Sequence, residues 1–235
     1  MVAERLYFRQ LLSGRDFAKG DPVAVQMLNF AYTVGDRSTG EALLVDPAYA
    51  VGELLDVLAG DDMRCVGVLA THYHPDHVGG DLGGWQIEGI AALLEHVQVP
   101  VHVQRAEVPW VARSTGVADH LVGHDGGEVV EVGSVSVELL HTPGHTPGSQ
   151  CFLVDGRLVS GDTLFLQGCG RTDLPGSDPA AMYESLKILE RVPDDTVLFP
   201  GHLYSPDPSA TMAETRRTNY VFRPRSAQEW LAAFG

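Results

Sequence analysis

The chain has 235 residues, of which 44% are hydrophobic, so it can bury a substantial core and form one or two domains. Its 31 acidic residues outnumber 16 Lys and Arg residues, and the formal net charge of -15 disfavours nucleic acids and anionic membrane surfaces as partners. Three widely spaced cysteines, Cys65, Cys151 and Cys169, form no CxxC pair and predict neither a zinc ribbon nor a disulfide framework.

The N-terminal segment shows no targeting pattern. Residues 1–20 mix arginines with acidic side chains, and no apolar run of roughly 18 residues occurs anywhere in the sequence. We therefore expect a cytoplasmic protein without a membrane span.

Apolar periodicity predicts strands and helices in alternation. Two strands around a glycine-containing turn are expected in residues 29–46, then a helix at 51–60 and a buried strand at 65–71. The further predictions are helices at 87–97, 106–114, 178–192, 210–218 and 227–234, strands at 99–104, 128–132, 134–140 and 196–201, and a hairpin at 150–162. Hairpins mixed with crossovers indicate α/β layers with a mixed sheet. We expect a single domain over residues 1–235 with a short C-terminal helical tail.

The stretch THYHPDH, residues 71–77, places three histidines and an aspartate directly after the buried strand at 65–71. Crowded imidazoles repel each other when charged, and they bury unsatisfied polar groups when neutral. A bound metal ion resolves both problems, so His72, His74, Asp76 and His77 are predicted metal ligands.

Three later strand ends carry residues of the same kind: His145 in TPGHTPGS, Asp162 in SGDTLF and His202 in PGH. Side chains that follow strands of a layered α/β protein gather at one edge of the sheet. Imidazole and carboxylate suit zinc, iron or manganese. Isolated histidines after strands are more often satisfied turn or surface residues, which is our prediction for His96, His102, His120, His124 and His141.

Taken in order, the motifs HxHxDH, TPGHTPGS, SGDTLF and PGH resemble those of the metallo-β-lactamase superfamily, over residues 29–202. The resemblance implies an αββα four-layer sandwich with mixed sheets and metal at one edge. It also implies two divalent metal ions, zinc or else iron or manganese. The implied ligands are His72, His74 and His145 for the first ion, Asp76, His77 and His202 for the second, and Asp162 as the bridge.

Two metal ions close together activate a water molecule, so the predicted nucleophile is a metal-bound hydroxide and not a side chain. Asp76 and Asp162 are expected to position that water. SGDTLFLQGCGRTD and PGHLYS look most like the glyoxalase II (hydroxyacylglutathione hydrolase) branch of the superfamily. That resemblance implies a thioesterase that cleaves a 2-hydroxyacyl thioester of a small thiol, such as S-D-lactoylglutathione.

GCGRTD also resembles the persulfide dioxygenases, which share the fold and bind one iron. By that resemblance, His72, His145 and Asp162 hold Fe(II), and its open positions accept glutathione persulfide and O₂. Only 33 residues follow His202, too few for the C-terminal helical domain of longer glyoxalase II enzymes. Conversely, the 68 residues from His77 to His145 exceed our expectation for a compact persulfide dioxygenase. The sequence leaves both reactions open.

Two residues are candidates for substrate binding. Arg171 in GCGRTD is the best placed cation for an anionic thiol carrier, with a structural salt bridge as the competing interpretation, and Tyr73 lies between two ligands. The basic cluster in the C-terminal tail is predicted to be a solvated helix face; it consists of Arg216, Arg217, Arg223 and Arg225. Cys169 is predicted to be a buried structural thiol.

Overall fold

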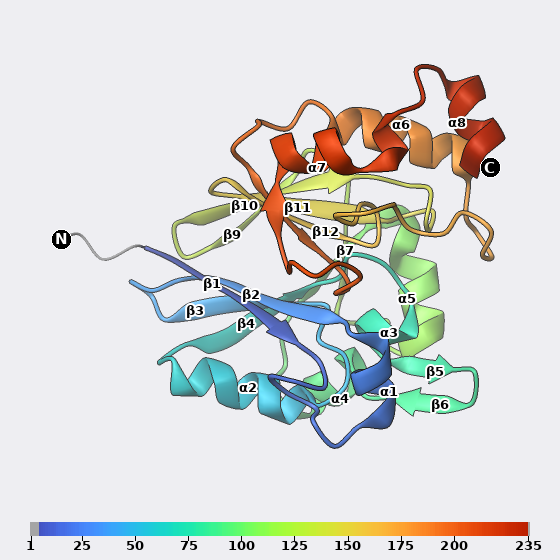
Figure 1. The fold of residues 1–235 in the computed structure, drawn as a ribbon. Coiled ribbons are helices and arrows are strands. Elements are labelled where there is room, and N and C mark those ends of the chain that lie inside the picture. The colour runs from blue at the N-terminus through green and yellow to red at the C-terminus, as the bar shows by residue number, and fades with distance from the viewer. Residues whose placement is uncertain (1–4, 235) are drawn as a thin grey trace.

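Two six-stranded β-sheets lie face to face in the computed structural model, which describes residues 5–234 (Figure 1). The first sheet runs in the order β1 (Leu6–Leu12), β2 (Phe30–Asp36), β3 (Glu41–Val45), β4 (Arg64–Leu69), β7 (Val101–Gln104) and β8 (Leu121–His124). The second runs in the order β14 (Ala210–Thr211), β13 (Val197–Pro200), β12 (Arg157–Gly161), β11 (Gln150–Val154), β10 (Val135–His141) and β9 (Val129–Val132). Each sheet contains parallel and antiparallel pairs, as the sequence predicts.

Helices cover the outer face of each sheet (Figure 1). The first sheet is covered by α2 (Val51–Gly60), α4 (Ile90–His96) and α5 (Val108–Thr115), and the second by α6 (Pro179–Leu189), α7 (Met212–Thr218) and α8 (Ala227–Phe234). Shorter elements are α1 (Pro22–Met27), α3 (Pro75–Val78), the 3₁₀ helices Arg105–Glu107 and Tyr220–Phe222, and the hairpin β5 (Gly80–Leu82) and β6 (Trp85–Ile87). The predicted αββα four-layer sandwich is confirmed.

The four layers follow from strands that are apolar on both faces. In β3, Leu43 packs between the two sheets, whereas the next residue, Leu44, packs beneath the outer helices of the first sheet. Successive side chains of a strand point to opposite faces, so an uninterrupted apolar run is required wherever both faces are covered. No helix within the described residues combines the length and the apolarity that crossing a bilayer requires.

Several elements were not predicted from the sequence. β1 pairs along its whole length with β2 at the edge of the first sheet, but its polar centre, Arg9 and Gln10, weakens the apolar pattern. The predicted helix at 87–97 is shorter, because β6 ends at Ile87 and α4 begins only at Ile90. β8 and α1 were also missed, since both are short and lie among glycines and charged residues.

Candidate metal centre

The seven predicted ligands come from four strand ends that meet at one edge of the two sheets. His72 and His74 lie between β4 and α3, and α3 carries Asp76 and His77. The remaining ligands follow β10, β12 and β13 of the second sheet; they are His145, Asp162 and His202. The structure therefore brings together both halves of the predicted set, although they are far apart in the sequence.

The first cluster consists of His72, His74 and His145, whose candidate ligand nitrogens all lie within 4.8 Å of one another. His74 Nδ1 and His145 Nε2 are 2.9 Å apart. Burial, followed by the proximity of His77 and His74, holds the pKa of His72 well below its usual value. Burial and the His145 ring likewise lower the pKa of His74 to about 4. Both rings are therefore neutral near pH 7, as a metal ligand must be.

The second cluster consists of Asp76, His77 and His202, again with ligand atoms within 4.8 Å of one another. His77 Nε2 lies 3.3 Å from His202 Nε2, and Asp76 Oδ2 lies 3.5 Å and 3.4 Å from these two nitrogens. Burial by itself would lower the pKa of His77, but the carboxylates of Asp76, Asp162 and Asp46 raise it to about 10.

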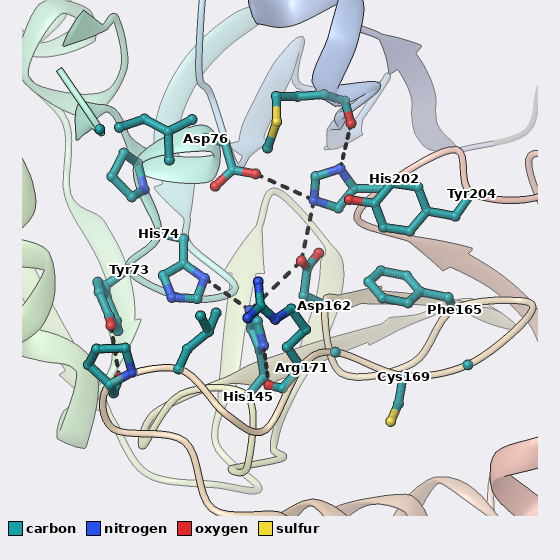
Figure 2. A pocket seen from close by; sticks show the side chains of 18 of the residues that line it. Tyr73, His74, Asp76, His145, Asp162, Phe165, Cys169, Arg171, His202 and Tyr204 are labelled. Carbon is teal, nitrogen blue, oxygen red and sulfur yellow. Dashed lines mark hydrogen bonds and ion pairs between the residues drawn. The ribbon is translucent and has the colours of Figure 1, made fainter. Parts of the chain in front are cut away.

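Asp162 lies between the two clusters, as Figure 2 shows. Its Oδ2 is 3.3 Å from His202 Nε2 and 3.8 Å from His145 Nε2, and its Oδ1 is 3.4 Å from His77 Nε2. The chain after β13 passes so close that an ideal Cβ at Gly201 would lie 2.2 Å from Asp162 Oδ1, so this position requires glycine. One carboxylate thus faces imidazoles of both clusters.

Two unsatisfied atoms test whether the site fits a metal ion. His72 Nε2 and Asp162 Oδ1 are buried and have no hydrogen-bond partner within residues 5–234. Buried polar atoms are normally paired, and an orphan calls for an explanation such as an ion. A nitrogen lone pair and a carboxylate oxygen that face a His-rich cluster are the donors that zinc or iron takes. The residues present fit a metal centre.

The imidazoles are oriented through their other ring nitrogens. His145 Nδ1 donates to the carbonyl of Arg171 at 2.8 Å, and His202 Nδ1 donates to the carbonyl of Met27 at 2.9 Å. Such outer partners fix the tautomer and direct Nε2 toward the metal position. His74 differs, because its Nδ1 faces the cluster.

Asp46 and Asn29 complete the surroundings of the clusters and were not identified from the sequence. Asp46 Oδ2 lies 2.9 Å from His77 Nδ1 and accepts from the Thr71 hydroxyl at 2.6 Å, so it orients the loop as well as the ring. Asn29 Nδ2 donates to Asp76 Oδ2 at 3.1 Å, and the Tyr49 hydroxyl donates to Asn29 Oδ1 at 3.0 Å.

Glu107 ties together the two loops of the first cluster and was also missed. One carboxylate oxygen accepts from the backbone N–H of Tyr73 at 2.8 Å and from the Thr146 hydroxyl at 2.7 Å. The other oxygen accepts from the backbone N–H of Gly148 at 2.6 Å. Tyr73 separates His72 from His74, and Thr146 follows His145, so a single buried carboxylate holds the first cluster from outside.

A cavity of about 890 Å³ opens onto the clusters, and both predicted substrate residues line it (Figure 2). Tyr73 is half-buried, stacks on Trp110 with ring centroids 4.9 Å apart, and donates from its hydroxyl to the carbonyl of Pro175 at 3.1 Å. Arg171 lines the cavity but pairs with Asp173, so both interpretations of this residue describe part of its environment.

The remaining cysteine, arginine and histidine candidates do not belong to the two metal clusters. Burial raises the pKa of the Cys169 thiol to about 12, so the side chain is protonated near pH 7 although it borders the cavity. Arg216 pairs with Asp194, and Arg217 lies 3.7 Å from Glu214. Of the isolated histidines, His96 is exposed, and the other four each have a hydrogen-bond partner: His102, His120, His124 and His141.

An αββα sandwich with a buried His and Asp cluster at one sheet edge defines a class of metal-dependent enzymes. A family model described as "Metallo-beta-lactamase superfamily" matches residues 28–202. The chain belongs to this superfamily, as its motifs predict.

Three known proteins resemble this chain over most of its length. The chain is 36% identical over 169 residues to the hydroxyacylglutathione hydrolase of Aeromonas salmonicida, covering 72% of this chain but only 59% of that enzyme. The structure of ETHE1 from Myxococcus xanthus superposes with a TM-score of 0.78 at 29% identity, covering 97% of this chain and 89% of that one. TTHA1623, solved in a di-iron-bound form, gives 0.66 at 31% identity, covering 83% and 95%.

Proposed function

We propose that the protein is a dinuclear metal-dependent thioesterase of the glyoxalase II type, which hydrolyses a 2-hydroxyacyl thioester of a small thiol. The observation that carries this proposal is the position of Asp162, whose carboxylate faces imidazoles of both clusters at 3.3 to 3.8 Å. A carboxylate shared by two ligand sets is the arrangement that a two-metal hydrolase needs.

The first ion would be held by His72, His74 and His145, the second by Asp76, His77 and His202, with Asp162 shared between them. When bound, the ions would supply Lewis acidity and lower the pKa of a water molecule toward neutrality. Two carboxylates among seven ligands leave a net positive centre, which suits the charge that develops on a thioester oxygen.

The chain's own side chains would bind and orient the reactants. Asp76 and Asp162 would accept hydrogen bonds from the attacking water and so direct its lone pair toward the carbonyl carbon. Tyr73 and Phe165, on the cavity wall, would hold the acyl thioester and exclude other water. A C–O bond forms as the C–S bond breaks, and the products are the thiol and a 2-hydroxy acid.

Two of the comparisons support this proposal. The 36% identity to a hydroxyacylglutathione hydrolase supports the reaction class, and the di-iron form of TTHA1623 supports a centre with room for two ions. Because the chain spans 59% of that hydrolase, its substrate does not carry over with the chemistry.

A second candidate is a mononuclear iron persulfide dioxygenase, with His72, His145 and Asp162 as ligands. The specific observation in its favour is Asn29, whose amide donates to Asp76 and lies 3.3 Å from His77 Nε2, so that the second cluster is hydrogen-bonded without an ion. The similarity to ETHE1 also supports this second candidate, because the match covers 89% of the ETHE1 chain.

Metal analysis combined with two activity assays separates the candidates. The purified protein should contain two metal ions per chain and release thiol from S-D-lactoylglutathione without consuming oxygen. One iron per chain with oxygen uptake on glutathione persulfide would instead establish the dioxygenase and refute the thioesterase.

A further inference from the structure

The wall of the cavity is poor in positive charge. Apart from the candidate ligands, Arg171 is the one Lys or Arg side chain among the described residues that line it, and Asp81 adds a carboxylate. Most of the other wall side chains are aromatic or aliphatic, such as Met27, Tyr73, Phe165, Leu174, Tyr204 and Tyr220. The cavity therefore offers apolar contact and little recognition of anions.

Arg171 already has a carboxylate partner. Its Nε lies 2.8 Å from Asp173 Oδ1 and its Nη2 lies 2.9 Å from Asp173 Oδ2, which is a two-pronged pair between a guanidinium and a carboxylate. An incoming carboxylate would have to compete with Asp173 for the same N–H groups.

The basic cluster of the C-terminal tail does not supply the missing charge. None of its four arginines is among the residues that line the cavity. Arg216 is engaged by Asp194 and by the carbonyl of Val192, and Arg217 lies next to Glu214. A net charge of -15 adds a negative potential that repels anionic ligands approaching from solvent.

We infer that the thiol carrier of the natural substrate is uncharged, and that a dicarboxylate tripeptide such as glutathione is a poor carrier for this site. The inference rests on the proposed thioesterase function and specifies its substrate class. An uncharged carrier needs no cationic partner, whereas each carboxylate that enters such a cavity gives up hydration and finds no unpaired Lys or Arg side chain on the described wall.

The test uses the metal-loaded protein and two matched thioesters. S-D-lactoyl-N-acetylglutathione, which has two carboxylates, is compared with its diethyl ester, which carries no charge and keeps the thioester bond in place. The rates of hydroxide-catalysed hydrolysis of the two compounds correct for intrinsic reactivity. We expect kcat/KM to be about 3- to 10-fold higher for the diester at low salt, because each unpaired charge costs a partly screened interaction. The difference should shrink as ionic strength rises.

A variant ties the preference to the Arg171 and Asp173 pair. Asp173→Asn frees the guanidinium, so kcat/KM for the free acid should rise about 3-fold while the diester value stays constant. Asp195→Asn removes the same charge from an exposed position that does not line the cavity and serves as the matched control.

The outcomes test the inference about the thiol carrier separately from the proposed thioesterase function. Faster hydrolysis of the free acid than of the diester at low salt overturns the inference and leaves the thioesterase intact. An equal response of the free acid to Asp173→Asn and to the control variant also overturns it. If the protein with two metal ions cleaves neither thioester, the thioesterase proposal fails and the inference fails with it.

Discussion

The two candidate metal clusters differ in how far the protein satisfies them by itself. In the first cluster, the His72 ring is neutral near pH 7, and its buried Nε2 has no hydrogen-bond partner among the described residues. In the second cluster, Asp76 Oδ2, His77 Nε2 and His202 Nε2 lie 3.3 to 3.5 Å from one another. The Asn29 amide donates to Asp76. The first cluster therefore keeps one unsatisfied ligand nitrogen beside the His74 and His145 contact, whereas each of the three ligands of the second cluster has a polar contact with the other two.

This difference indicates that the second cluster determines whether the protein binds one ion or two. An ion that enters the first cluster satisfies an orphaned nitrogen and displaces one contact between imidazoles, but an ion that enters the second displaces contacts among all three of its ligands. We therefore expect the first ion to bind more tightly. The proposed hydrolase and the competing dioxygenase share the first cluster and differ in the use of the second.

The largest effect is expected for the residue that both clusters share. Asp162→Ala should lower kcat/KM by more than the roughly 100-fold that is typical for loss of an outer partner, since it removes a carboxylate in contact with both ligand sets. Steady-state kinetics and elemental analysis of the folded variant measure the effect. Activity within about 10-fold of the wild type would contradict a shared role.

The second largest effect is expected for His202, which belongs to the second cluster only. His202→Ala should leave one ion per chain at the first cluster and reduce thioester hydrolysis by roughly 100-fold or more, because the second ion loses an imidazole ligand. Metal content and hydrolysis are measured on the same preparation. Near-normal hydrolysis with a single ion would refute a dinuclear mechanism.

Glu107 tests whether the first cluster depends on its outer support. Glu107→Gln replaces one acceptor oxygen by an N–H₂ group that must face the donors of Tyr73, Thr146 or Gly148. We expect affinity for the first ion to fall about 10- to 100-fold and affinity for the second to change little. Calorimetric metal titration shows the two steps, and Glu131→Gln, on an exposed strand position, is the control. Equal weakening of both steps would mean a general loss of structure.

Asn29 tests the opposite cluster. Asn29→Asp replaces the amide that donates to Asp76 by an acceptor with negative charge. The second ion should bind about 10-fold more tightly, equal to about 1.4 kcal/mol, and the first should be unaffected. Without metal, the variant should be less stable, because a second carboxylate then faces Asp76 where an N–H donor stood. If the second step of the titration does not change, Asn29 does not control the second ion.

The ligands could be predicted from the sequence because each follows a strand within a short motif. The hairpin turn at Asp155-Gly156 could be predicted because its backbone dihedral angles favour those two residue types. Both have positive φ, 43° and 70°, between β11 and β12. The surrounding partners could not be predicted. Asn29 contacts a residue 47 positions away and Glu107 one 34 positions away, and neither stands in a motif. Such pairings depend on how the loops pack, which periodicity does not encode.

The smallest expected effect is a pH dependence of folding stability that arises at His102, away from both clusters. Burial, and then the neighbouring His124 ring 2.9 Å away, lowers the pKa of His102 to about 4. A histidine in the unfolded chain titrates near 6.5, so between about pH 6.5 and 4 the unfolded state binds more protons and stability falls as pH falls.

Urea unfolding of metal-free protein at about pH 7 and about pH 4.5 measures this contribution, which we expect to be about 1 to 2 kcal/mol after allowing for partial exposure of the ring. His102→Gln should lose less stability across that range than the wild type, whereas His96→Gln, at an exposed position, should match the wild type. If His102→Gln is as acid-sensitive as the wild type, His102 does not account for the sensitivity, and other titrating groups, such as the hydrogen-bonded carboxylate of Asp36, must supply it.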